Sequence, residues 1–171
     1  FFAMTRDYAA VVTRYHEGYD GVDHRRLLCL TPDYLLVFDD LQSESEHRYD
    51  WLYHHRAKSV TSEITDTPVA QLAESFPGQE YLRDLKQGRT RESVNVQFVD
   101  DTCTTHLQIA QSLATDDRSA ITTITLGDGV GGSVTDRVPL AIATRRGTIA
   151  QFAAVLEPVT SKATRQVSTV E

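Results

Sequence analysis

Hydrophobic and polar residues alternate with a period of two in short segments along much of the chain. The segment Val94–Phe98 has apolar residues at every second position, and the segment Thr105–Ala110 repeats the pattern. Successive side chains of a strand point to opposite faces, so this alternation is typical of strands with one face in a core. Asp100–Thr102 separates the two segments, and we expect a β-hairpin here. The same alternation predicts that His106 lies on the exposed face of its strand.

Further segments carry strand-like composition between turn residues. They are Ala9–Arg14, His24–Leu30, Tyr34–Asp39, His47–His55, Ser119–Leu126, Leu140–Arg145 and Thr148–Leu156. Thr31-Pro32-Asp33 predicts a turn between the second and third of these segments. Arg146-Gly147 predicts a tight turn between the last two.

Helical signals are sparse. Only Val69–Phe76 and Glu80–Lys86 have a composition that would allow a turn or two of helix, the first beginning at Pro68 and ending at Pro77-Gly78. Many short strands without alternating helices favour an antiparallel sandwich or barrel over a βαβ fold. We therefore predict an all-β antiparallel β-sandwich over residues 1–158, followed by a polar tail or edge strand over residues 159–171.

Composition narrows the classes of function. The chain of 171 residues has 40% hydrophobic and 24% charged residues, which is ordinary for one globular domain. Its net charge of −7 argues against a nucleic-acid binder, and it has no apolar run of the ~20 residues needed to span a bilayer. The opening residues Phe1–Met4 resemble neither an initiator nor a signal peptide. We expect the chain to be a fragment or a processed piece.

Metal and disulfide signals are weak. Cys29 and Cys103 lack the spacing of metal ligands, so two buried free thiols are the first expectation and a disulfide the second. The run Gly127–Gly132 lacks the Lys-Ser/Thr of a phosphate loop, and a long hairpin loop is favoured over a calcium site. Histidines together with Asp39 and Asp40 could supply metal donors, but a structural role as scattered strand and surface residues is favoured.

The segment Tyr15–Arg56 concentrates histidine, arginine and aromatic residues. On a strand, His24 and Arg26 project to one face and Arg25 to the other, and the same rule separates His54 from His55. Arginine can grip a carboxylate or sulfate, and aromatic rings can lie against sugar faces, so a groove for an anionic sugar is one interpretation.

The alternative interpretation is that the same segment has a structural role and binds no ligand. Trp51 and Tyr53 would be core anchors, and the charged residues would pair across strands. For Trp51 the structural role is favoured; for Arg25 and Arg26 the two interpretations stand about even. The spacing supports no Ser-His-Asp or Cys-His catalytic arrangement.

These segments resemble, in order, the C-terminal part of heparinase II/III-like proteins and related alginate or oligoalginate lyases. The resemblance is carried by the runs Tyr19–Arg26, Tyr34–Asp40 and Tyr49–Arg56, and then by Pro139–Gly147 and Phe152–Pro158. It covers most of the chain with motifs of moderate specificity.

The resemblance implies a two-part enzyme in which an N-terminal (α/α) toroid packs on a C-terminal antiparallel sandwich. Such lyases cleave uronate-containing polysaccharides by β-elimination, in which the uronate carboxylate must be neutralised before its neighbouring proton can be removed. The family's His-x-His/Asp, Asp-x-Gly and Ala-His-Asn-Thr-like strings do not occur here. The resemblance therefore implies no cofactor in this fragment, and places any zinc ligands of the full-length enzyme upstream of Phe1.

We therefore expect a sandwich that supports a lyase cleft, with no catalytic residue of its own and an apolar patch on its inner face. The candidate substrate-binding residues are His24, Arg25, Arg26, His54, His55 and Arg56. The expected partners are an acidic polysaccharide and the toroid of the same protein, in the periplasm or outside the cell, without nucleic acid or membrane. The alternatives are a non-catalytic carbohydrate-binding sandwich and a purely structural one.

Overall fold

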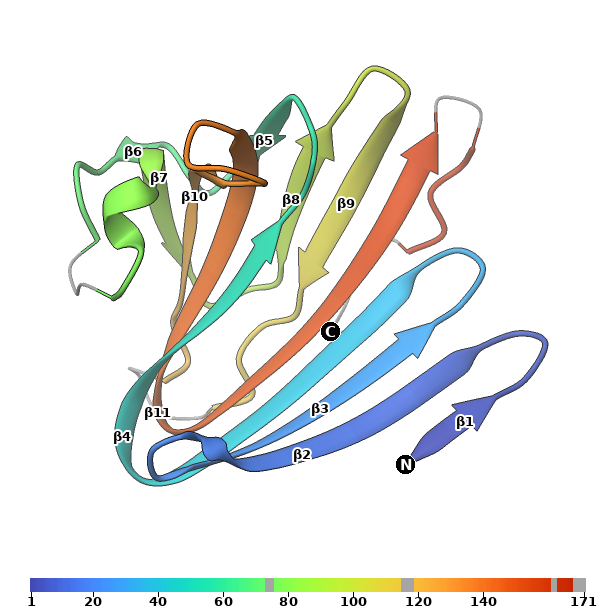
Figure 1. Ribbon diagram of the computed structural model, residues 1–171, viewed down its shortest axis with the longest axis vertical. Coiled ribbons are helices and arrows are strands. Elements are labelled where there is room, and N and C mark those ends of the chain that lie inside the picture. The colour runs from blue at the N-terminus through green and yellow to red at the C-terminus, as the bar shows by residue number, and fades with distance from the viewer. Residues whose placement is uncertain (73–75, 115–118, 161–162, 168–171) are drawn as a thin grey trace.

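A computed structural model describes residues 1–72, 76–114, 119–160 and 163–167, and these form an antiparallel β structure (Figure 1). The strands are β1 (Phe2–Met4), β2 (Ala9–Tyr19), β3 (Val22–Leu30), β4 (Leu35–His54), β5 (Ser59–Thr61), β6 (Thr67–Pro68), β7 (Arg83–Thr90), β8 (Val94–Val99), β9 (Cys103–Ile109), β10 (Thr122–Val130) and β11 (Arg137–Thr160). A single 3₁₀ turn, η1 (Gln79–Tyr81), is the helical element of the described residues. The predicted all-β class is confirmed.

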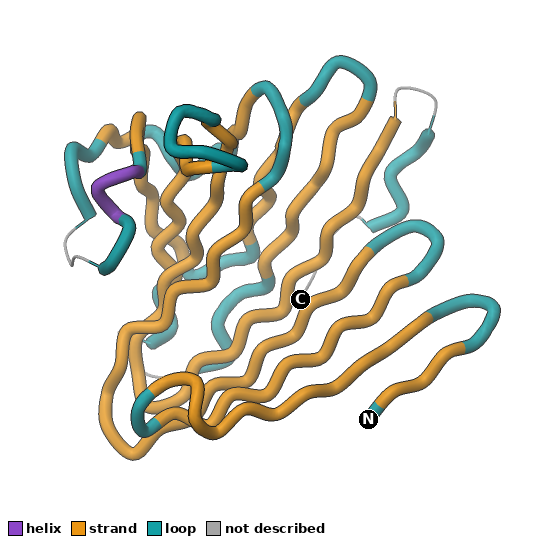
Figure 2. The backbone as a smooth tube through the Cα atoms, viewed as in Figure 1, coloured by secondary structure: helices purple, strands orange, loops and turns teal. Residues whose placement is uncertain are grey.

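Two long bent strands, β4 and β11, are shared by two layers (Figure 2). The early arm of β4 (35–42) pairs with the late arm of β11 (149–160), and with β1, β2, β3, β9, β8 and β5 these arms make a wide layer. The late arm of β4 (47–54) pairs with the early arm of β11 (137–147), and with β10, β7 and β6 these make a narrow layer. Each long strand thus continues from one layer into the other.

The bend of β11 lies at Gly147, where the register with β4 shifts between Gly147 and Ile149. Gly147 has a φ of 148°, and an added Cβ would approach the Ser119 hydroxyl to 2.8 Å, so glycine suits this position. The predicted tight turn at Arg146-Gly147 is therefore wrong. Because β4 bends alongside β11, a bulge lets the strand continue where a hairpin would reverse it. The predicted strands Tyr34–Asp39 and His47–His55 are likewise the two arms of β4.

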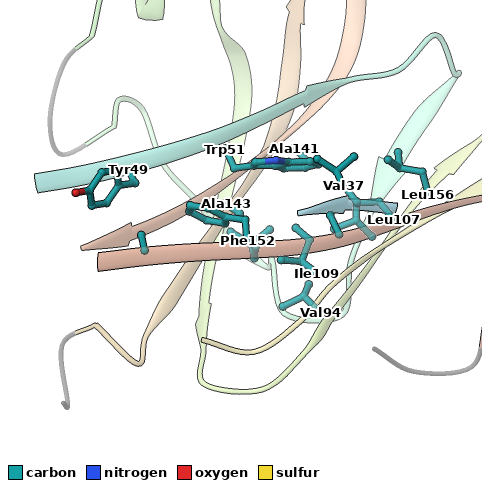
Figure 3. Packing of buried hydrophobic residues seen from close by; sticks show 14 of the residues in the cluster. Val37, Tyr49, Trp51, Val94, Leu107, Ile109, Ala141, Ala143, Phe152 and Leu156 are labelled. Carbon is teal, nitrogen blue, oxygen red and sulfur yellow. The ribbon is translucent and has the colours of Figure 1, made fainter. Parts of the chain in front are cut away.

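The main core fills the space between the layers, and Figure 3 shows Trp51, Phe152 and Ile109 within it. Val96, Phe98 and Leu107 are fully buried, as the alternation of β8 and β9 predicts, and these strands form the predicted hairpin. A smaller cluster lies on the outer side of the narrow layer, where Leu72 and Leu85 pack with Leu140 and Ile142.

This smaller cluster explains why the first predicted helical segment is not helical in its described part and the second is limited to one 3₁₀ turn. The described part of Val69–Phe76 is not helical, and Val69, Leu72 and Phe76 pack against the narrow layer as irregular chain. In Glu80–Lys86, η1 ends at Tyr81 and the rest belongs to β7, which pairs with β10. Burial of apolar side chains against a sheet outweighs weak local helix propensity here.

Several smaller predictions have clear outcomes. Cys29 and Cys103 are free thiols as expected, although both are only half-buried. The glycine-rich run is a hairpin connection as expected, although β10 continues into it as far as Val130. His106 is not on an open face: its Nδ1 is buried, and the neighbouring Gln108 donates to the carbonyl of Val167. The segment 163–167 lies close to that side of β9, as the Gln108–Val167 bond shows.

Candidate functional site: a hollow at the bend

A hollow of about 910 Å³ lies where the layers diverge beside the bend of β4. Its floor is the inner face of β3 and the early arm of β4, with His24, Arg26 and Asp39. One wall is the late arm of β4 from His47 to Leu52. The turn at 18–20 and the pair Phe76-Pro77 complete its lining. In the described residues the late arm of β4 has β11 as its only strand neighbour, so this arm forms an edge above the floor.

Asp39 organises the floor of the hollow. Its side chain is 1% exposed and accepts hydrogen bonds from three directions. Arg26 donates through Nε at 2.6 Å and through a terminal nitrogen at 2.8 Å, and Trp51 donates through Nε1 at 2.9 Å. His24 Nε2 lies 2.6 Å from Asp39 Oδ1, so the ring donates from Nε2 to the carboxylate. A buried carboxylate is tolerated because it is paired and multiply hydrogen-bonded.

The register of β3 and β4 brings these groups together. Arg26 and Asp39 are directly opposite across the two strands, and His24 is opposite Leu41. The hydrogen bond from Arg26 to Asp39 raises the pKa of the guanidinium. The Arg26 side chain nevertheless remains 42% exposed toward the hollow, whereas His24 is 16% exposed. Arg26 is therefore fixed at one end by Asp39 and accessible at the other.

Aromatic rings surround this charged floor. Tyr19 is 58% exposed at the rim, with its ring centroid 6.1 Å from that of His24. Trp51 is 7% exposed and stacks on Tyr53 at 6.2 Å, which confirms its predicted role as a core anchor. Its Nε1 also holds Asp39, so Trp51 joins the core to the hollow.

The wall of the hollow carries a second ion pair. Arg48 Nε lies 3.0 Å from Asp50 Oδ1, and the Thr144 hydroxyl donates to the same carboxylate oxygen at 2.5 Å. The Arg48 guanidinium carbon lies 6.0 Å from the centre of the Phe76 ring. Each arginine of the hollow is thus matched by an adjacent aspartate, and Asp20 adds a further carboxylate. The hollow therefore presents arginine hydrogen-bond donors in fixed orientations, while the neighbouring carboxylates balance the positive charge of these arginines.

The six predicted site residues fall in three places. His24 and Arg26 share the hollow, as the alternation predicts. Arg25 is on the opposite face of β3, where it lies 3.5 Å from Asp23, itself bound by Arg14 at 2.8 Å. The hydrogen bond with Arg14 is the largest cause of a lowered pKa at Asp23. The structure does not bring Arg25 to the hollow.

His54, His55 and Arg56 lie at the far end of β4. His55 bridges the hydroxyls of Tyr53, at 2.9 Å, and Thr105, at 3.1 Å, and burial lowers its pKa. Arg56 pairs with Asp136 at 2.9 Å beside the loop that joins β10 and β11. The backbone N–H of Gly132 and the guanidinium of Arg56 together lower the pKa of Asp136. These contacts serve the local structure and are not shared with the hollow.

Asp39 and Arg48 are the residues that the sequence-based site prediction omitted. Asp39 entered the sequence analysis only as a possible metal donor, yet it positions both His24 and Arg26. No described group of three or more His, Cys, Asp or Glu residues is arranged to hold a metal ion. His24 Nε2 already donates a hydrogen bond to Asp39, so it is not free to act with that carboxylate as a metal ligand. The His24–Asp39 pair therefore does not fit a zinc ion of the kind that the family resemblance implies for the full-length enzyme.

Comparison with known proteins gives a consistent result. Residues 4–167 match the family described as "Heparinase II/III-like, C-terminal". The fold is similar to that of heparan sulfate lyase HepC from Pedobacter heparinus, with a TM-score of 0.56 and 16% identity over 96% of this chain and 22% of that one. It is also similar to the heparinase III BT4657 gene product, with a TM-score of 0.57 and 12% identity over 94% of this chain and 21% of that one.

The matched solved lyases are much longer than this chain. The chain spans about a fifth of the length of the solved lyases it matches. A search of curated proteins gives no significant match. In the described residues, no helix has the length and apolar character needed to cross a membrane. Because the family match extends over nearly the whole sequence, the chain belongs to the heparinase II/III-like C-terminal family.

Proposed function

We propose that this chain is the C-terminal sandwich of a polysaccharide lyase that cleaves uronate-containing polysaccharide by β-elimination, and that it supports the cleft while other parts of the enzyme perform the chemistry. Family membership and the heparan sulfate lyases of similar fold support the reaction class. A toroid domain of the same polypeptide would supply the opposite side of the cleft. Polymeric substrates favour action in the periplasm or outside the cell.

The observation that carries this proposal is the fixed and half-exposed guanidinium of Arg26. Asp39 holds two of its nitrogens at 2.6 and 2.8 Å, so the side chain has one defined orientation in the hollow. Its remaining N–H groups can donate to a carboxylate, sulfate or hydroxyl of a sugar. His24, held by the same carboxylate, adds a second oriented group. Pre-organised donors reduce the ordering cost of binding.

The chemistry also favours a supporting role over a catalytic one. β-Elimination requires a base at the proton next to the uronate carboxylate and a group that offsets the carboxylate charge. In the hollow, Asp39 and Asp50 already offset Arg26 and Arg48, which lowers their capacity to neutralise a substrate carboxylate. The described residues thus provide positioning, and we expect the base to lie elsewhere in the enzyme.

Substitution of Arg26 in the intact lyase that contains this chain tests the proposal, with its sequence neighbour Arg25 as the matched control. Loss of a hydrogen bond to a charged group costs about 1.5–3 kcal/mol, so Arg26→Ala should raise KM by about tenfold or more and change kcat little. Arg25→Ala should leave both unchanged, since Arg25 lies on the other face. Product is followed by the ultraviolet absorbance of the unsaturated uronate. Equal effects of the two substitutions would contradict the role of Arg26.

The chain of 171 residues, assayed alone, should release no unsaturated product from heparan sulfate or alginate. Appreciable turnover would contradict the supporting role.

A non-catalytic carbohydrate-binding module is the second candidate. The exposed ring of Tyr19 beside the charged floor favours it, because sugar rings stack on such side chains. Calorimetric titration of the chain with heparan sulfate or alginate oligosaccharides separates the two functions. A module would bind the oligosaccharide as tightly alone as within the longer protein, whereas a supporting sandwich would bind it measurably only within the intact enzyme.

A further inference from the structure

The polypeptide that follows β11 returns to cover part of the outer face of the wide layer. Alternation along β9 and β11 points Gln108 and Glu157 away from the core, where side chains of a strand normally meet solvent. Gln108 is nevertheless only 5% exposed, and Glu157 only 3%. Both side chains bind the segment 163–167, which we call the strap. The strap therefore covers polar side chains that the sheet alone would leave open to water.

Hydrogen bonds to two side chains of the sheet attach the strap. The carboxylate of Glu157 accepts from the backbone N–H groups of Gln166 and Val167, the latter at 3.2 and 3.3 Å. The Gln108 amide donates to the Val167 carbonyl at 3.0 Å. The hydrophobic clusters of the described residues include no residue of the strap. Polar contacts thus hold the strap in place, and Glu157 is its main anchor.

The closed strap leaves two buried nitrogens without a hydrogen-bond partner among the described residues. One is Nδ1 of His106 on β9, and the other is Nε of Arg165 in the strap. Another nitrogen of Arg165 donates to Asn95 at 3.3 Å, and Arg165 Nε lies 3.6 Å from Glu157 Oε2. Buried polar atoms are ordinarily hydrogen-bonded, so their isolation here opposes closure. Opening of the strap would let water bind both nitrogens.

Two charged groups of the described residues face His106. Glu157 lies directly opposite on β11 and Arg165 approaches from the strap, whereas β8 places the uncharged Gln97 opposite His106. Burial is the main cause that lowers the pKa of His106, and Arg165 lowers it further, although Glu157 raises it. A protonated His106 is therefore less favourable under the closed strap than in water. Closure is favoured above about pH 6.5 and weakened as the pH falls below it.

We propose that the strap is an acid-sensitive latch, which lies closed over β9 at neutral pH and opens on protonation of His106 while the sheet stays folded. A protonated His106 would compete with the strap amides for the carboxylate of Glu157. The sheet does not depend on the strap, because β9 and β11 pair directly over residues 103–109 and 154–160. Segments held by few apolar contacts open most easily, so the strap would open before the sheet. Opening uncovers Gln108 and Glu157 on the face of the wide layer that is opposite to the hollow.

Amide hydrogen exchange in the chain of 171 residues tests the latch. The amides of Gln166 and Val167 donate to Glu157, so their protection, relative to an unstructured peptide at the same pH, reports closure. This protection should fall about tenfold between pH 7.5 and pH 5.5, because pH 5.5 is about one unit below the ordinary pKa of histidine. The amides of the β9–β11 ladder should keep their protection over the same range.

Three variants assign the response to its groups. His106→Gln cannot take up a proton, so protection of the strap amides should be the same at both pH values. His55→Gln is the matched control and should retain the fall, since His55 contacts β9 through Thr105 on the core-facing side, away from the strap. Glu157→Gln removes the charged acceptor, so protection of the strap amides should already be low at pH 7.5.

Unchanged protection of the strap amides at pH 5.5 would overturn the proposal. A fall of the same size in His106→Gln would overturn it too, because another group would then control the strap. If the β9–β11 ladder loses its protection together with the strap, acid unfolds the sheet and the strap is no separate latch. This comparison of strap and ladder is made in the unsubstituted chain, so it decides the outcome even where a variant does not fold.

Discussion

Arg145 lies over the ring of Phe152, with its guanidinium carbon 4.9 Å from the ring centre, and so connects the two arms of β11 across their bend. Arg145 is 2% exposed and has no carboxylate partner among the described residues. Its nitrogens donate instead to the Thr122 hydroxyl at 2.9 Å and to the carbonyls of Gln151 and Ala110. Burial lowers the pKa of Arg145 to about 10, which leaves it charged at neutral pH.

Replacement of Arg145 should therefore destabilise the bend. Arg145→Leu would remove the donors of buried acceptors, and each buried acceptor left unsatisfied costs about 1–3 kcal/mol. We expect a loss of about 3 kcal/mol or more in the free energy of unfolding, measured by urea denaturation of the chain. Arg89→Leu, at an exposed position of β7, is the control and should change stability by no more than about 0.5 kcal/mol. Similar values for the two variants would contradict the proposed connection.

Asp39 should be more important for stability than its neighbour Asp40. Asp39→Asn keeps the shape of the side chain but leaves Arg26 without its ion pair and His24 with a poorer acceptor. Breaking a buried pair costs about 3–5 kcal/mol, and the partial exposure of Arg26 places the expected loss at the lower end, about 3 kcal/mol.

Asp40→Asn is the matched control for Asp39. Asp40 lies on the other face and accepts from the neutral amides of Gln42 and Gln151. Its substitution should cost less than about 1 kcal/mol by the same denaturant titration. If Asp40→Asn lowers the free energy of unfolding as much as Asp39→Asn, the burial and ion pairing of Asp39 do not make it more important than Asp40.

The strands were predictable where one face is buried and the other is not. The alternation in β8 and β9 gives their faces directly, because each has one apolar face against the core. The continuity of β11 was not predictable from its own residues, since glycine suits a tight turn and a bulge equally. What distinguishes the two is the partner strand β4, which is about a hundred residues away in sequence and bends with it.

The same contrast holds for the hollow. Alternation alone places His24 and Arg26 on one face. The predicted turn at Thr31-Pro32-Asp33 would pair Leu30 with Tyr34, whereas the observed connection is one residue longer and pairs Leu30 with Leu35, which sets Arg26 opposite Asp39. The contact of Trp51 with Asp39 depends on the bend of β4, which folds its late arm back over its early arm. No local pattern specifies that bend, so this part of the site required the structure.

Acidification should destabilise the fold through its partly buried histidines, His55 and His106. Burial lowers the pKa of His55 and of His106 below the ordinary 6.5. The unfolded chain then binds protons more readily than the folded chain as the pH falls through about 6.5, so stability is present above that pH and declines below it. For His106 the nearby guanidinium of Arg165 lowers the pKa further, whereas Glu157 raises it.

Unfolding midpoints measured between pH 7.5 and pH 5.5 check this expectation, a range of about one unit on either side of an unperturbed histidine. A His106→Gln variant should lose part of the pH dependence, because glutamine cannot take up a proton. His54→Gln, at an exposed position, should retain it. If the unfolding midpoint of His106→Gln depends on pH as strongly as that of the unsubstituted chain, groups other than His106 cause the pH dependence.

Gly88 allows β7 to pass close to the turn at 62–65. A Cβ at this position would lie 1.5 Å from the carbonyl oxygen of Ile64 and 2.5 Å from its carbon, which are backbone atoms that cannot rotate away. Gly88→Ala therefore forces β7 or the turn to move, and overpacking of this kind costs about 1–3 kcal/mol. The expected result is a lower unfolding midpoint, with increased amide hydrogen exchange in β7 and in residues 62–65. Gly132→Ala is the control: its Cβ would meet side-chain atoms no closer than 3.5 Å, and it should leave both measurements nearly unchanged. If Gly88→Ala unfolds at the same urea concentration as Gly132→Ala, the close approach of β7 to Ile64 does not exist in solution.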